Sequence, residues 1–202
     1  MNRRRFLEVA AATTGAPFIL RSGAHADTQC SPDGQVCDSY VNPPQVFASG
    51  SMQYMPFWCW AACISMVFAH HGHPVSQARI VSEVYGGPVN LPSGNGLTIS
   101  AQLNRDWTDD YGQPFRSRMV AAYDPQMNVV AINNYQIVDA LDQNRPIILG
   151  AGTHAVLLIG VRHFQTPMGP NVIGAQYRDV HRTGLPVTES VWTATSTRYA
   201  PP

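Results

Sequence analysis

The sequence predicts an α+β fold, with a helical N-terminal half followed by an antiparallel sheet in the C-terminal half. The stretch CWAACISMVFAHH, residues 59–71, is apolar almost all round, which is typical of a buried helix too short to span a bilayer. The stretch RPIILGAGTHAVLLIGVRHF, residues 145–164, holds two apolar runs separated by GAGT, which indicates adjacent buried strands. No repeat or low-complexity block appears.

The remaining elements follow from breakers and periodicity. Residues 27–50 are expected to be loop-like, because Pro43, Pro44 and Gly50 interrupt regular structure. The helix that starts at Cys59 is closed by Gly72. Apolar spacing and turn residues predict three further helices and two further strands. The helices are expected at 76–85, 97–107 and 134–143, and the strands at 115–123 and 171–180 after the turn TPMG.

The chain divides into a predicted signal peptide, 1–26, and one domain, 27–202. Three consecutive arginines followed by Phe6 and Leu7 resemble the twin-arginine export signal, and AHA at 24–26 is a cleavage signature. The apolar part is short and interrupted by Pro17, which argues against a membrane anchor. We therefore expect an exported, periplasmic or secreted bacterial protein without a stable membrane anchor after cleavage.

Charge and composition exclude several functions. Residues 27–202 carry a small excess of acidic over basic side chains, whereas nucleic-acid binding needs a basic patch, so we expect no nucleic-acid partner. The sequence contains no lysine, which excludes Schiff-base chemistry on a lysine. Neither a cofactor nor a metal is expected, and the oligomeric state cannot be inferred from the sequence.

The four cysteines have two kinds of spacing. Cys30 and Cys37 flank the turn-rich SPDGQV and could close a small disulfide ring in an oxidising compartment. Cys59 and Cys63 are four residues apart, on one face of the predicted helix. A four-cysteine zinc site is the alternative, but these spacings differ from the usual zinc knuckles.

Cys59 is either part of the hydrophobic core or a nucleophile. It falls at the start of the predicted helix, where unpaired backbone N–H groups stabilise a thiolate. Gln53, six residues upstream, could donate a second hydrogen bond to an oxyanion, and Trp58 and Trp60 would flank the thiolate and limit water. Cys63, one turn deeper among apolar residues, is expected to be an inert thiol.

A general base must come from elsewhere in the chain. His70, His71 and His73 lie at the far end of the helix, where a solvated helix terminus explains them better than a metal. His154 instead opens the apolar run HAVLLIGV after a turn of small residues. A buried imidazole there needs a partner, although such a histidine is often only structural.

These motifs together resemble the papain-like cysteine peptidases. The pattern Gln-x5-Cys-Trp-Ala-Ala-Cys, followed by Gly-Thr-His-Ala-Val-Leu-Leu-Ile-Gly-Val, is nearest to compact bacterial forms related to bacteriocin-leader and effector peptidases. The resemblance implies a papain-like fold, with Cys59 heading the central helix and His154 on a strand of the sheet. It also implies that Gln53 completes the oxyanion hole and that an Asn or Asp on the next strand orients the histidine.

Asp179 is our choice for that third member. A hairpin centred near residue 167 places position 180 opposite His154 and Asp179 beside it, whereas Asn171 would lie about 30 Å away. Compact relatives often have Asp-Pro here, while this chain has Asp179 followed by Val180. With another register, Asp179 would be a plain surface carboxylate.

The leading hypothesis is an exported cysteine peptidase that hydrolyses peptide bonds through Cys59, His154, Asp179 and Gln53, with a peptide or protein as its substrate. One alternative is a Cys/His amidase or transpeptidase that acts on cell-wall peptides through the same residues. Another is a non-catalytic papain-like binding module, for which the trio Gln53, Cys59 and His154 would have no use.

Overall fold

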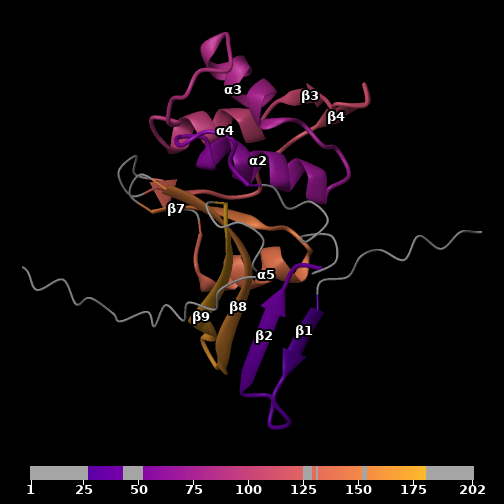
Figure 1. Ribbon diagram of the computed structural model, residues 1–202. Helices are drawn as coiled ribbons and strands as arrows, with labels where there is room; N and C mark the ends of the chain where they lie inside the picture. The colour runs from indigo at the N-terminus through magenta and orange to yellow at the C-terminus, as the bar shows by residue number, and fades with distance from the viewer. Residues whose placement is uncertain (1–26, 43–51, 125–128, 131, 152–153, 181–202) are drawn as a thin grey trace, which may run out of the picture.

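The computed structural model describes residues 27–42, 52–124, 129–130, 132–151 and 154–180. The predicted signal peptide, 1–26, lies outside these residues. Helices α2, α3 and α4 gather on one side of the molecule, and a five-stranded sheet with α5 against it makes up the other side (Figure 1). The fold is α+β, with helices and an antiparallel sheet, as the sequence predicted. Within the described ranges, no helix is long and apolar enough to cross a membrane.

Three helices make the helical side: α2 (Cys59–His70), α3 (Gln77–Tyr85) and α4 (Gly96–Leu103). Helix α2 is central and buried along most of its length, because nearly all its side chains are apolar. Helix α3 ends at Gly86, whose φ of 75° is left-handed and therefore suits glycine. The predicted helix 97–107 was too long: α4 stops at Leu103, and Asp106–Thr108 forms strand β3 instead.

The strand predicted at 115–123 is also corrected. Strand β4 covers only Pro114–Arg116 and pairs with β3, while β5 (Tyr123–Asp124) pairs with β6 (Val129–Val130). Strand β4 ends at Arg116, and the next residue, Ser117, still donates its backbone N–H to Arg105 O, just before β3. Side-chain contacts decided this local structure, since Trp107 and Phe115 both pack edge-on against Phe68 of α2.

Strand β8 (His154–Thr166) is the centre of the sheet. Strand β9 (Gly169–Asp179) pairs along one side of it. On the other side, β7 (Ile147–Ala151) pairs with its first half and β2 (Val36–Tyr40) with its second half. All these pairs are antiparallel, as predicted.

The prediction that residues 27–50 are loop-like was wrong for 27–40. Strand β1 (Asp27–Cys30) forms a hairpin with β2, and the Cys30–Cys37 disulfide joins directly opposed residues. This pairing uses up two of the four cysteines, so a four-cysteine zinc site is excluded. The segment forms strands because β2 pairs with β8, which is far away in the sequence. The short, polar sequences of β1 and β2 gave no sign of this contact.

One continuous core joins the two sides. Helix α5 (Asn134–Asp142) starts at a capping box made by Asn133 and Gln136, and it buries Val138 and Leu141 against the sheet. On the helical side, α2 packs against β8. The core therefore includes Cys59 of α2, Ala155 of β8 and Val180, which follows β9.

Candidate active site

Cys59 is the first residue of α2 and is only 7 % exposed. The tryptophans on either side of it are held by hydrogen bonds from their indole N–H groups. Trp58 Nε1 donates to Val89 O at 2.9 Å, and Trp60 Nε1 donates to Leu91 O at 3.2 Å. These two bonds tie the loop after α3 to the start of α2. Both tryptophans are buried beside Cys59, where we expect them to limit the access of water to the thiol.

Cys63 lies one turn deeper and is fully buried. Burial raises the pKa of its thiol well above the usual range, and the charges of Cys59 and Asp179 raise that pKa further. Cys63 is therefore an inert thiol, as expected from the sequence. Cys63 shares one core cluster with Cys59 at the start of α2 and with Val180, which follows the end of β9.

His154 is the first residue of β8, and Asp179 is the last residue of β9. The ring Nε2 of His154 lies 2.9 Å from Oδ1 of Asp179. An ionised carboxylate only accepts hydrogen bonds, so the imidazole donates through Nε2–H. This bond holds the ring orientation and places the proton of the neutral imidazole on Nε2.

The hairpin register differs by one from the prediction. The predicted register places Asp179 opposite Ala155, whereas in the structure Asp179 is paired with Val156. Val156 is two residues from His154 and therefore lies on the same face of β8. Each strand also contains one irregularity, near Ile159 in β8 and near Ile173 in β9. These two bulges cancel, so Asp179 still reaches His154.

Gln53 lies beside this site, but its amide is engaged. Its Nε2 donates to Met55 O at 3.0 Å and to Pro56 O at 2.8 Å, and its Oε1 is buried with no partner among the described residues. Its backbone N donates to Val180 O at 3.1 Å, directly after Asp179. Donation to an oxyanion would therefore require the amide to exchange one loop carbonyl for the substrate, and this role stays a prediction.

Sequence reasoning missed Gln77, the first residue of α3. Its side chain is 1 % exposed, Oε1 accepts from Tyr54 N at 3.1 Å, and Nε2 donates to Met52 O at 2.7 Å. The amide thus holds the backbone on both sides of Gln53. From the sequence alone, a buried glutamine at this position cannot be told apart from a surface glutamine at the start of a helix.

Three further histidines, His70, His73 and His163, make structural contacts. His70 was expected in a solvated helix end, but it is 4 % exposed and its Nε2 contacts Asn144 O at 3.1 Å. His73 pairs with buried Asp109 at 3.1 Å and stacks on Phe115. His163 is fully buried beside Ser39. Among the described residues, no group of three or more His, Cys, Asp or Glu could hold a metal ion.

Residues 44–196 match the family model described as Peptidase_C39 like family. The chain belongs to this family. The match covers all four residues singled out above, Gln53, Cys59, His154 and Asp179, and it shows a cysteine peptidase-like fold. The β1–β2 hairpin precedes the stretch shared with the Peptidase_C39 like family. No curated protein and no solved structure matches the chain significantly.

Proposed function

We propose that the chain is an exported cysteine peptidase that hydrolyses peptide bonds. The observation that carries the proposal is the hydrogen bond between His154, the first residue of β8, and Asp179. The residues that follow them, Ala155 and Val180, belong to the same core cluster as Cys59. A histidine bonded to a carboxylate is oriented and kept in one tautomer. A cysteine at the start of a buried helix lies where backbone N–H groups favour a thiolate.

In the proposed reaction, His154 Nδ1 accepts the Cys59 thiol proton and the thiolate attacks the substrate carbonyl. The tetrahedral intermediate collapses as the imidazolium gives its proton to the leaving amine, and a thioester with Cys59 remains. A water molecule, deprotonated by His154, then attacks the thioester. The product acid leaves and the thiol is regenerated. Asp179 stabilises the imidazolium throughout.

Two kinds of donor would hold the oxyanion of the intermediate. The first is the backbone N–H of Cys59, because the first N–H groups of a helix have no partner within the helix. The second is the Gln53 amide, once it releases Met55 O or Pro56 O. Such a donor contributes about 10²- to 10³-fold in turnover.

Export is part of the proposal, and two observations support it. The N-terminal arginines with Phe6, Leu7 and AHA have the pattern of a twin-arginine signal. The Cys30–Cys37 disulfide belongs to the class of bonds that form and persist in oxidising compartments.

Cys59→Ala tests the function directly. We expect hydrolysis of a mixed peptide library to fall by about 10⁴-fold or more, because the nucleophile is gone. Cys63→Ala is the matched control: it removes the neighbouring thiol, and hydrolysis should continue. Full hydrolysis by Cys59→Ala, measured by mass spectrometry of the products, would end the proposal. An added amine that is incorporated into the products would favour acyl transfer over hydrolysis.

A further inference from the structure

We propose that Gln77 is a positioning residue for the active site, acting through the segment 52–54. Gln77 starts α3, and its buried amide bonds two backbone groups of that segment, Met52 O and Tyr54 N. A buried amide that uses both its donor and its acceptor on one peptide segment holds that segment as a neighbouring strand would. This inference rests on the proposed function, because it concerns how the same site is held.

The opposite edge of the segment is bonded as well. Between Met52 and Tyr54, the Gln53 backbone N points the other way and donates to Val180 O at 3.1 Å. Successive backbone groups of an extended segment point to opposite sides, which is why one short stretch can serve two partners. The segment 52–54 is thus bridged between α3 and the residue that follows Asp179.

This bridge places two proposed functional groups at once. The side chain of Gln53 leaves the segment between the two anchored backbone groups, and Val180 continues directly from Asp179. If the Gln77 amide is lost, Met52 O and Tyr54 N lose these hydrogen bonds, and the backbone from which the Gln53 side chain extends is no longer held in place. A displacement of about 1 Å in a positioning group can cost about 100-fold in rate.

A role only in stability is the alternative, since any buried glutamine with two hydrogen bonds stabilises a fold. Gln102 provides the matched control. It is also buried, lies in α4 on the same helical side, and its Oε1 accepts from Arg105 rather than from the segment 52–54. Gln77→Met and Gln102→Met therefore remove the same polar group from the same kind of environment.

The experiment measures kcat and KM for peptide hydrolysis at a temperature where every variant is folded. We expect Gln77→Met to lower kcat by about 10- to 100-fold with KM changed by less than about threefold. Gln102→Met should keep kcat within about twofold of the wild type. Equal losses of kcat in the two variants would mean that Gln77 is only structural and would overturn the proposal.

A double-mutant cycle with Gln53→Ala tests whether Gln77 acts through Gln53. In the Gln53→Ala background, we expect Gln77→Met to lower kcat by a clearly smaller factor than in the wild type, because one of the two groups that it positions is absent. Effects that simply multiply would contradict this route.

Gln77→Glu adds a pH signature. The ionised carboxylate cannot donate to Met52 O, whereas the protonated acid can do so while still accepting from Tyr54 N. The kcat of Gln77→Glu relative to the wild type should therefore rise as the pH falls, and a ratio independent of pH would argue against the proposal.

Hydrolysis by Cys59→Ala would refute the proposed function itself. An inactive Cys59→Ala beside a fully active Gln77→Met would refute only the role of Gln77.

Discussion

At the scale of single residues, the site depends on how one imidazole is held. His154 and Asp179 come from the start of one strand and the end of the next, and one hydrogen bond of 2.9 Å joins them. Both side chains are partly exposed, so the pair contributes little to stability and its importance lies in orienting the ring.

We expect Asp179→Ala to lower kcat/KM by about 10²- to 10⁴-fold, because His154 loses the group that holds its tautomer and stabilises its charged form. The melting temperature should change little. Asp110→Asn is the control, since Asp110 is a partly exposed carboxylate paired with Arg79 at 3.6 Å on α3. Steady-state kinetics measure the effect. If the two variants have the same kcat/KM, Asp179 is an ordinary surface carboxylate.

At the scale of elements, the two ends of α2 have different tasks. The start carries Cys59, and the last turn carries His70, which is buried against Asn144 at the junction of α5 and β7. Burial lowers the pKa of His70, and the contact with Asn144 O opposes this only in part. The end of the helix is therefore anchored by a neutral imidazole.

This anchor predicts acid sensitivity. In the unfolded chain His70 titrates near 6.5, and in the folded protein its pKa is lower, so the unfolded state binds more protons between these two values. The stabilising contribution is complete above about pH 6.5 and is lost as the pH falls through the folded pKa. Urea unfolding across this range should show the decline, and His70→Gln should flatten it. A profile of His70→Gln parallel to that of the wild type would contradict this assignment.

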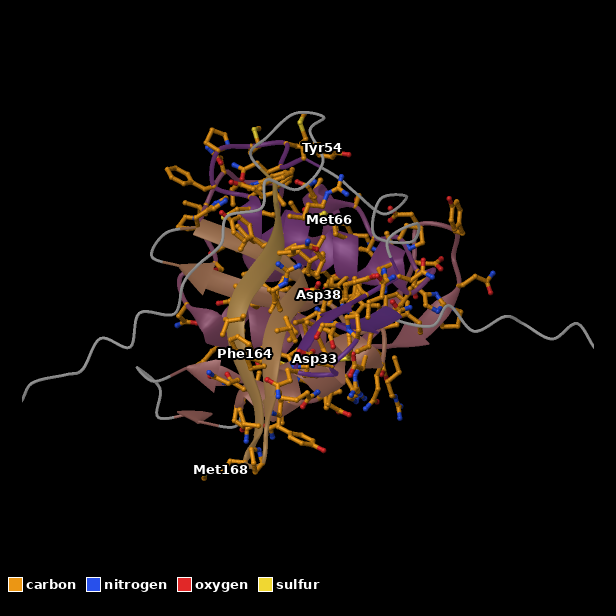
Figure 2. All side chains as sticks on the ribbon, turned by 90° about the horizontal axis from the view of Figure 1, so that it is seen from below. Asp33, Asp38, Tyr54, Met66, Phe164 and Met168 are labelled. Carbon is orange, nitrogen blue, oxygen red and sulfur yellow. A yellow bond between two sulfur atoms is a disulfide. The ribbon has the colours of Figure 1, made fainter. Side chains whose placement is uncertain are left out.

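At the scale of the whole molecule, β8 connects two regions with separate tasks. Its first half pairs with β7 and begins at His154, whereas its second half pairs with the disulfide-linked β1–β2 hairpin. The turn of this hairpin lies at the end of the molecule away from α3 and α4 (Figure 1). In Figure 2, Asp33 of this turn is likewise well separated from Tyr54, in the loop before Cys59.

We therefore expect the disulfide to affect stability more than activity. Replacing both Cys30 and Cys37 by serine should lower the free energy of unfolding by about 2.5 kcal/mol, the loop-entropy value for a ring this small. The kcat should stay within about twofold, because the hairpin is remote from Cys59. Urea unfolding and kinetics with and without reductant measure the two effects. A large loss of kcat in the folded double variant would show that the hairpin supports the site.

The sequence by itself determined the elements whose signals are local. The apolar run of α2 has the length of a buried helix, and the two runs around GAGT have the composition of buried strands, so both were predicted. Gln53, Cys59 and His154 were selected from their places beside such runs and from the resemblance to papain-like peptidases, and their catalytic roles stay predictions. Asp179 was chosen from a hairpin register that was wrong by one, yet its carboxylate still lies 2.9 Å from the His154 ring, and its catalytic role stays a prediction.

Only the tertiary structure decided what depends on contacts between distant segments. The strand β2 exists because it pairs with β8, His70 is buried because Asn144 lies against it, and Gln77 faces residues 52–54 because α3 packs on α2. Each of these residues is unremarkable within its own stretch of sequence. Their environments come from segments far away along the chain, and periodicity or spacing carries no information about such contacts.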